Sequence, residues 1–313
     1  MTPLLAARAA MVDPVTDVAL RGKSEWRLIG KEMQRQDIVE KSTGTQEYGI
    51  DLAMDGMVHA AVRFNPRQGG AINGYDASAA EGMRGVQKVL PVSGGFAVVA
   101  DNTWRAFQAV NAIEADWGDA PYPAEQDAHW AVLAESFTEE RLDDEWRHDG
   151  DVPAGLGARD AVTAEYRAPY VAHAPLEPLN ALVVATDARI DIWAGHQMPR
   201  TVEDYVAKVS GMDVENIHFH NLFAGGSFGH RLEFENIRYA TEIALQMKGT
   251  PVKLTFTREE DFAHDYPRQI AMGRGAAVLD GDAIKTLDLS ICCPSPINSQ
   301  MPNMVFRSDR FLA

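Results

Sequence analysis

The chain is poor in cysteine, with only Cys292 and Cys293 among its 313 residues. Because the two are adjacent, they cannot supply four ligands to a structural zinc or iron–sulfur site, and a disulfide framework is excluded. Metal chemistry would have to come from a bound cofactor or from histidine and carboxylate side chains, and the sequence predicts no protein-ligated metal site. No apolar run approaches the roughly 18–20 residues that a membrane-spanning helix needs.

Basic residues are also scarce, because 29 Lys and Arg face 45 Asp and Glu and give a net charge of −16. This sign argues against a nucleic-acid partner, which requires phosphate neutralisation. Nothing in the sequence indicates a nucleophilic triad. The first eleven residues lack the basic start and the apolar stretch of a signal peptide, and the sequence gives no localisation.

Composition is that of an ordinary globular protein, with 46% hydrophobic and 24% charged residues. At about 150 residues per domain, the length indicates roughly two domains. Apolar periodicity and turn residues divide the chain into a connecting arm, an α+β unit, an acidic linker and a second α/β unit. These segments are expected at residues 1–44, 45–120, 121–157 and 158–313.

The first α+β unit has the predicted order strand, strand, short helix, strand, strand, helix, strand. Asp101, Asn102 and Thr103 offer N-cap side chains just before the second of these helices. In the second unit, apolar residues at helical spacing predict a long helix at 232–248, closed by Gly249. Thr257 and the charges after it indicate a capped turn with an ion pair. Strands are expected at 48–52, 57–64, 86–91, 96–100, 161–166, 181–186, 190–193, 217–221 and 252–257, and further helices at 128–137 and 201–210.

The most distinctive local pattern is Ala-Gly-Gly-Ser-Phe-Gly-His-Arg at residues 224–231, between an expected strand and the helix at 232–248. Its glycines, Gly225, Gly226 and Gly229, let backbone N–H groups approach a ligand, and the helix N-terminus favours an anion or an oxo group. The loop lacks the Lys-Ser or Lys-Thr of a P-loop and the spacing of dinucleotide-binding glycines. The alternative interpretation is a purely structural turn.

Two further positions are candidates for a site. Glu177 lies between two prolines that fix its direction, and the alternative is a tight turn whose carboxylate caps a neighbouring backbone. Gln197 follows the strand at 190–193 and can donate its amide to a bound oxygen, although an isolated Gln is usually a surface residue. His218 and His220 share one side of a strand without a suitably spaced third ligand, which favours packed or surface histidines over a zinc site.

Taken in order, these motifs resemble the molybdenum-binding subunit of the xanthine oxidase family, and most closely the large subunit of isoquinoline 1-oxidoreductase and related bacterial aldehyde dehydrogenases. The resemblance covers about residues 20–288. It implies an α+β fold, in which an α/β hammerhead domain precedes an α/β molybdenum-cofactor-binding domain. The matching segments are 25–31, 41–44, 48–51, 169–178, 197–199, 225–231, 251–253 and 257–261.

The resemblance also implies hydroxylation with water-derived oxygen at a molybdenum held by a pterin, in the form of molybdopterin cytosine dinucleotide. Gln197 would hydrogen-bond an oxygen ligand of the metal, and Glu177 would support the site from its rigid turn. Leu232 replaces the Glu that grips the purine in purine-oxidising members, which suggests an aldehyde or aromatic N-heterocycle as substrate. The residues assigned to cofactor binding are Gly225, Gly226, Ser227, Phe228, Gly229, His230 and Arg231.

Subunits of this family are more than twice as long, and their general-base Glu lies in a downstream segment that this chain does not contain. The expectation is therefore an incomplete subunit, inactive alone, that self-associates or binds companion segments, a 2Fe-2S subunit and a cytochrome c. Family members are often periplasmic or membrane-associated. The alternatives are a non-catalytic relative that binds a partner chain or an anionic ligand, and a plain phosphate site that binds a nucleotide.

Overall fold

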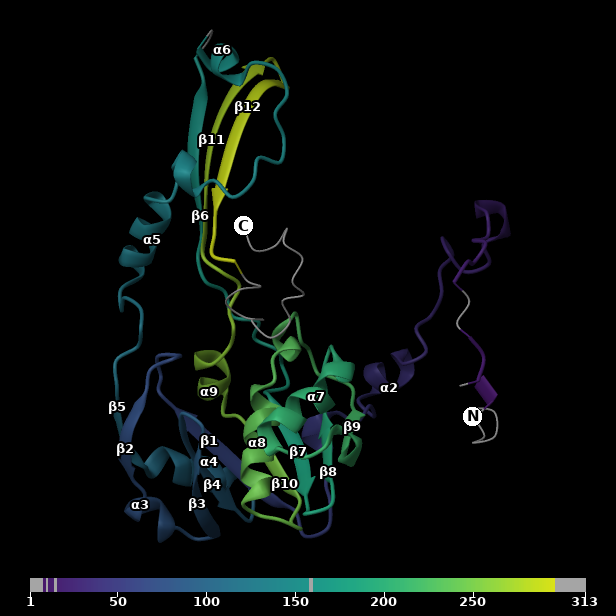
Figure 1. The fold of residues 1–313 in the computed structure, drawn as a ribbon, viewed down its shortest axis with the longest axis vertical. Coiled ribbons are helices and arrows are strands. Elements are labelled where there is room, and N and C mark those ends of the chain that lie inside the picture. Colours follow the sequence, from purple (N-terminus) through teal and green to yellow (C-terminus); the bar gives the residue numbers. More distant parts are fainter. Residues whose placement is uncertain (1–7, 10, 14–15, 158–159, 296–313) are drawn as a thin grey trace. The chain divides into compact units, whose positions relative to one another are not determined.

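The computed structural model describes residues 8–9, 11–13, 16–157 and 160–295, and Figure 1 shows their fold. The chain divides into two compact units, Met1–Gln46 and Glu47–Ala313. The described part of the first unit contains the 3-10 turn η1 and the helix α2, neither of which has a buried residue. None of the helices in the described residues is long and apolar enough to cross a bilayer. The bounds are η1 (Lys23–Glu25) and α2 (Ile38–Thr43).

A seven-stranded sheet organises the second unit, with the strand order β3-β4-β1-β10-β7-β8-β9. Strand β1 pairs antiparallel with β4 and parallel with β10. The sheet is therefore continuous between the segment expected as a hammerhead domain and the segment expected to bind a cofactor. Its strands are β1 (Val58–Phe64), β3 (Val86–Val92), β4 (Gly95–Ala100), β7 (Asn180–Ala185), β8 (Ile190–Ala194), β9 (Ile217–Asn221) and β10 (Val252–Thr255).

Between β1 and residue 117 the elements run β1-β2-α3-β3-β4-α4-β5. The predicted order differs at its start, because the two strands expected before the short helix were 48–52 and 57–64, and β2 was not predicted. The Asn102 side chain accepts a hydrogen bond from the Arg105 N–H at 2.9 Å, which confirms the predicted N-cap of α4. Phe96 and the small residues of α4 pack between this helix and the sheet. The additional elements are β2 (Ile72–Asp76), α3 (Ser78–Glu81), α4 (Thr103–Ala112) and β5 (Glu114–Trp117).

Two helices, α7 (Pro199–Ser210) and α8 (Glu235–Leu245), share one apolar core with the seven-stranded sheet. The expected stripe of α8 is buried through Ile237, Ala240 and Ala244. The helix begins three residues later than expected, because the 3-10 turn η5 (His230–Leu232) separates it from the glycine loop. It also ends three residues early. The sequence predicted that the N-terminus of the long helix directly follows the glycine loop. This prediction is wrong, because η5 lies between them.

The segment 48–52 is not the strand that its apolar alternation indicated. It forms the 3-10 turn η2 (Gly49–Asp51), in which the Tyr48 N–H donates to Asp51 Oδ2 at 3.0 Å. The N–H of Ile50, two residues later, donates to Glu177 Oε1. These hydrogen bonds to side chains replace the ladder that a strand would need.

A three-stranded antiparallel sheet, β12-β11-β6, contains a hairpin that the sequence analysis did not anticipate. Its turn passes through Gly281 at a φ of 61°. Thr257 caps α9 through the Glu260 N–H and Arg258 pairs with Asp261, as predicted. The last residues of the segment expected at 158–313, from 296 onward, lie outside the described residues. The remaining elements are α5 (Gln126–Ala134), η3 (Glu139–Arg141), α6 (Val152–Gly157), β6 (Val162–Ala168), η4 (Val214–Asn216), α9 (Arg258–Ala263), β11 (Ala271–Asp280) and β12 (Ala283–Cys292).

Candidate cofactor-binding site

The glycine loop connects β9 to η5 and has an unusual backbone. Gly226 and Gly229 have φ values of 104° and 116°, and Phe228 between them has a φ of 59°. The left-handed region costs a non-glycine residue about 1–2 kcal/mol, so the fold holds Phe228 there against its intrinsic preference. Strain of this kind is found preferentially at ligand-binding sites.

The loop lies directly against the turn that contains Glu177. A Cβ on Gly225 would fall 2.6 Å from the Glu177 Cβ, and one on Gly229 would fall 2.9 Å from His173 Nε2. Real Cβ atoms do not approach so closely, so glycine is required at both positions by packing as well as by φ at Gly229. The loop therefore packs closely against the Glu177 turn, and the approach to a ligand that its glycines indicated stays a prediction.

Replacing Gly225 with Ala should lower the free energy of unfolding by about 1–3 kcal/mol, the usual cost of overpacking, because Glu177 Cβ belongs to a fixed turn. Urea denaturation measures the change. Gly82→Ala is the matched control, since its new Cβ meets nothing within 4 Å and its φ is −83°. Equal stability of the two variants would show that the loop yields without cost.

Glu177 is buried and all of its carboxylate contacts are with the protein. Oε1 accepts from the Ile50 N–H at 3.0 Å and from Asn180 Nδ2 at 2.9 Å. Oε2 accepts from the Gly225 N–H at 2.7 Å and from Arg231 Nη2 at 2.9 Å. The carboxylate thus joins η2, β7, the glycine loop and η5. The sequence left two interpretations of Glu177 open, a cap for a neighbouring backbone and a support for the loop. Its carboxylate does both, because it accepts from backbone N–H groups and holds the loop at the same time.

Arg231 supports the loop from the buried side. Its side chain is 1% exposed, and Nε donates to the Gly226 carbonyl at 2.9 Å while Nη2 also donates to the Glu177 carbonyl at 3.0 Å. Burial lowers the pKa of Arg231, and the neighbouring carboxylates Glu177 and Asp261 oppose that shift. The guanidinium therefore holds the Gly226 carbonyl of the loop and the Glu177 carbonyl of the neighbouring turn. Arg231 contributes only its backbone to the loop itself.

Gln197 and Ser227 meet on the accessible side of the loop. The Ser227 hydroxyl donates to Gln197 Oε1, and the same hydroxyl oxygen accepts from the Arg231 N–H at 3.1 Å. The Gln197 N–H donates to the Arg231 carbonyl at 2.9 Å, which fixes the residue at the start of α7. With its oxygen engaged, the Gln197 side chain presents its NH₂ group as a donor. The sequence-predicted residues Gln197 and Ser227 are therefore brought together.

Within the described chain, four consecutive N–H groups of the loop have no hydrogen-bond partner, those of Gly226, Ser227, Phe228 and Gly229. Unpaired backbone donors in succession form a concavity suited to an anion or an oxo group. Phe228 is 76% exposed and the neighbouring Leu176 is 90% exposed. Leu232, expected in a substrate pocket, is half-buried in η5 and donates its N–H to the Gly229 carbonyl.

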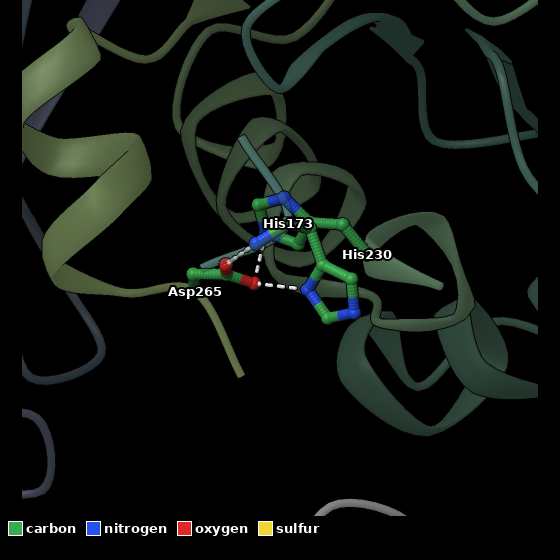
Figure 2. Close-up of side chains that lie close together, drawn as sticks. All are labelled: His173, His230 and Asp265. Carbon is green, nitrogen blue, oxygen red and sulfur yellow. Dashed lines mark hydrogen bonds and ion pairs between the residues drawn. The ribbon is translucent and has the colours of Figure 1, made fainter. Parts of the chain in front are cut away.

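The His230 side chain turns away from the loop surface into a buried cluster with His173 and Asp265 (Figure 2). Asp265 Oδ1 accepts from His173 Nδ1 at 2.7 Å, and Oδ2 accepts from the His173 N–H at 2.5 Å. Burial lowers the pKa of His230 to about 4, although Asp265 acts in the opposite direction. Of the residues assigned to a cofactor, His230 can therefore offer only its backbone to the loop side.

The remaining candidate residues and a large cleft do not form part of the glycine loop. His220 stacks on Trp193 at a centroid distance of 4.6 Å and bonds Asp191 Oδ1 at 3.2 Å, which accounts for it as a surface histidine. A cleft of about 1140 Å³ is lined by residues that include Tyr122 and Tyr266, and none of its lining residues belongs to the glycine loop. The donor surface of the loop and this cleft are thus separate features.

Sequence reasoning missed Asp265 and Asn180, which hold the site together. Asp265 follows α9 and lies 92 residues from His173, and Asn180 is the first residue of β7. Neither stands in a recognisable motif. The only available signal was that polar residues at the ends of apolar segments often contact neighbouring loops.

Comparison with known proteins assigns the chain to a family. A model of the molybdopterin cofactor-binding domain matches residues 134–293, which is 160 of 313 residues. Isoquinoline 1-oxidoreductase subunit beta of Brevundimonas diminuta is 30% identical over 85% of this chain and 35% of its own length. The membrane-bound aldehyde dehydrogenase (pyrroloquinoline-quinone) of Gluconacetobacter polyoxogenes is 28% identical over 88% of this chain and 37% of its own length.

Solved structures confirm the predicted fold class. Quinoline 2-oxidoreductase from Pseudomonas putida 86 superposes with a TM-score of 0.67 and 20% identity, over 88% of this chain and 40% of that one. Aldehyde oxidoreductase from Desulfovibrio desulfuricans gives a TM-score of 0.64 and 18% identity, over 85% and 34%. The chain spans little more than a third of the two curated relatives named above. It belongs to the molybdopterin cofactor-binding domain family and corresponds to part of a molybdenum-binding subunit of the xanthine oxidase family.

Proposed function

We propose that this chain forms one wall of the molybdenum–pterin site of a hydroxylase that oxidises an aldehyde or an aromatic N-heterocycle with oxygen from water. The observation that carries the proposal is a group of neighbouring hydrogen-bond donors without partners in the described structure. It consists of the four unpaired N–H groups of the glycine loop and the NH₂ group of Gln197. Such a surface recognises oxygen atoms that carry negative charge.

The residues present fit the cofactor that the family implies. The loop passes so close to its support that a Cβ at Gly225 or Gly229 would collide with it. When bound, the molybdenum cofactor supplies the hydroxylation and the uptake of electrons, while the protein supplies position and hydrogen bonds. Gln197 and the loop N–H groups would hold it, and Glu177 and Arg231 would keep the loop in place.

The substrate class rests on apolar side chains near the loop. Leu232 follows the loop where a charged residue would be needed to bind a purine, and Phe228 exposes an aromatic ring beside the donors. An apolar wall favours an aldehyde or an aromatic heterocycle and does not favour a purine. The names of two relatives, isoquinoline 1-oxidoreductase and aldehyde dehydrogenase, accord with this class.

The same proposal makes the chain an incomplete catalytic unit. The general-base Glu would come from the part of the relatives that this chain does not span, so the chain alone would be inactive. Electrons would leave through a 2Fe-2S subunit and then a cytochrome c, and the pterin would be the cytosine dinucleotide form. Several relatives are named as subunits, which supports a multi-chain assembly.

Elemental mass spectrometry of the chain purified from its native host, with whatever polypeptides accompany it, tests this function. We expect about one molybdenum atom per chain and companion polypeptides. Oxidation of aldehydes or N-heterocycles by the isolated chain would contradict the proposed incompleteness. A metal-free chain that binds a nucleotide would assign the loop to phosphate instead.

In the molybdenum-containing assembly, replacing Gln197 with Ala should slow substrate oxidation by about 10²-fold, the usual effect of losing one aligned donor at a developing charge. Molybdenum content and the rate are measured on the same sample. Gln87→Ala on the exposed side of β3 is the matched control and should leave the rate unchanged. A Gln197 variant with full molybdenum content and full rate would remove the residue from the site.

A second function, binding of a partner chain without catalysis, is favoured by one face of the three-stranded sheet. The register places the side chains of Val162 and Leu287 on the same face, and those of Tyr166 and Ile291 as well. All four side chains are at least half exposed, and so is Leu289, which lies between Leu287 and Ile291 in β12. Contiguous exposed apolar side chains on one face of a sheet mark a contact surface. Companion polypeptides without molybdenum would support this alternative.

A further inference from the structure

His173, His230 and Asp265 bring three metal-ligating side chains together from segments distant in sequence. His173 follows β6, His230 begins η5 and Asp265 follows α9. One ligand atom from each lies within 4.8 Å of the other two. Figure 2 shows both imidazole rings linked to the same carboxylate oxygen of Asp265.

The cluster is buried and incompletely paired. His230 is 1% and Asp265 3% exposed, and neither ring nitrogen of His230 has a hydrogen-bond partner in the described structure. The contact between His230 Nε2 and Asp265 Oδ1 is 3.5 Å long. A buried polar group without a partner costs about 1–3 kcal/mol, so a ligand at Nε2 would remove an existing penalty.

The distances suit a small tetrahedral ion. Ligand atoms about 2.0–2.1 Å from a zinc ion lie about 3.3 Å apart in tetrahedral geometry. Asp265 Oδ1 is 2.7 Å from His173 Nδ1 and 3.5 Å from His230 Nε2, which brackets that value. In a three-ligand site, coordination would replace the His173 hydrogen bond, and the two imidazoles, whose ring centroids lie 5.6 Å apart, would turn toward the ion.

A carboxylate stands behind one of the imidazoles. Metal-bound histidines usually donate their other ring N–H to a carboxylate or carbonyl. His230 Nδ1 faces Asp261 Oδ1 at 3.8 Å, and this oxygen also lacks a hydrogen bond within the described structure. His173 is 19% exposed, which leaves a path for an ion to enter.

We propose that His173, His230 and Asp265 bind one zinc ion, with a water molecule in the fourth position. Two imidazoles and one carboxylate are ligands that zinc prefers, whereas magnesium and calcium prefer oxygen. His230 directly follows Gly229, whose Cα faces His173. The ion would therefore fasten the end of the glycine loop to the 173–178 turn and to the segment after α9.

Titration of the chelator-treated full chain with zinc, in competition with a chromogenic zinc indicator, tests the site. All proteins carry Cys292→Ser and Cys293→Ser, because these adjacent thiols are free and could bind zinc themselves. We expect one zinc per chain, and at least a tenfold weaker affinity in His173→Gln and in Asp265→Asn. The His218→Gln, His220→Gln double variant is the matched control and should bind zinc as the parent does.

Absence of stoichiometric zinc binding, or an affinity unchanged in both ligand variants, would overturn the proposal. Because a buried variant can misfold, zinc-edge X-ray absorption of the Cys292→Ser, Cys293→Ser parent gives a second test that needs no substitution at the site. We expect nitrogen and oxygen ligands with imidazole scattering, and a sulfur-ligated ion would also overturn the proposal. These measurements involve no molybdenum, so they succeed or fail independently of the proposed function.

Discussion

Replacing Glu177 with Ala should lower the free energy of unfolding by about 3–5 kcal/mol, because it leaves the buried Arg231 guanidinium without its counter-charge. The substitution also removes the acceptor for the N–H groups of Ile50 and Gly225. Urea denaturation followed by circular dichroism measures the loss. The large value is expected because both side chains are almost fully buried, at 6% and 1% exposure.

Two further variants separate the ion pair from general damage. Asp187→Ala breaks the exposed pair with Lys248 and should cost less than about 1 kcal/mol. Adding Arg231→Met to Glu177→Ala removes the uncompensated charge, so the double variant should recover part of the stability lost in the single variant. A single variant no less stable than Asp187→Ala would show that Arg231 finds another partner or solvent.

The elements that the sequence predicted well are those with local signals. The α4 cap needs only Asn102 and the N–H of Arg105, three residues away, and α8 is indicated by the spacing of its apolar residues. The missed hairpin β11–β12 had such a signal in Asp280-Gly281-Asp282, a favoured turn sequence between β-prone segments. Apolar residues alternate along β12, but they lie on an exposed face of the sheet. The strand therefore has no buried core positions by which the sequence could have identified it.

The site was predictable in the same uneven way. The glycines and Gln197 could be found because special backbone conformations and strand ends restrict residue type. The partners of Glu177 could not, because hydrogen bonds over 127 residues to Ile50 and 48 residues to Gly225 leave no periodicity in the sequence. The wrong strand at 48–52 has the same cause, since Glu177 captures an N–H that a strand would have used.

At the glycine loop, the buried polar groups hold the backbone in place and the exposed polar groups are left available to a ligand. Glu177 and Arg231 satisfy each other and the loop backbone from the inside, whereas Gln197 and the unpaired N–H groups remain accessible. A ligand that meets this surface encounters donors already held in place, which spares it the cost of ordering them. This arrangement explains why a loop with three glycines and a strained Phe228 can be part of a specific site.

The stability that Glu260 contributes should fall as pH rises from about 4.5, its ordinary pKa, to about 7, its pKa in the folded protein. Burial raises the pKa of Glu260 to about 7 from the ordinary value of 4.5, against the opposing effects of the Phe64 N–H and Arg63. The folded protein therefore keeps a proton that the unfolded chain has lost. Stability is highest while both states are protonated and is lost as pH rises through 7.

The comparison of Glu260→Gln with the parent isolates this contribution. A shift of 2.5 units corresponds to about 3 kcal/mol, so the variant should gain about that much relative to the parent between pH 5 and pH 8. His264, whose pKa is lowered by burial to about 4, changes stability in the opposite direction below 6.5 but contributes to both proteins. Glu259→Gln, in the same turn but exposed, should retain the parental pH profile. A difference between Glu260→Gln and the parent that stays constant across this range would mean that Glu260 is ionised in the folded protein at pH 5.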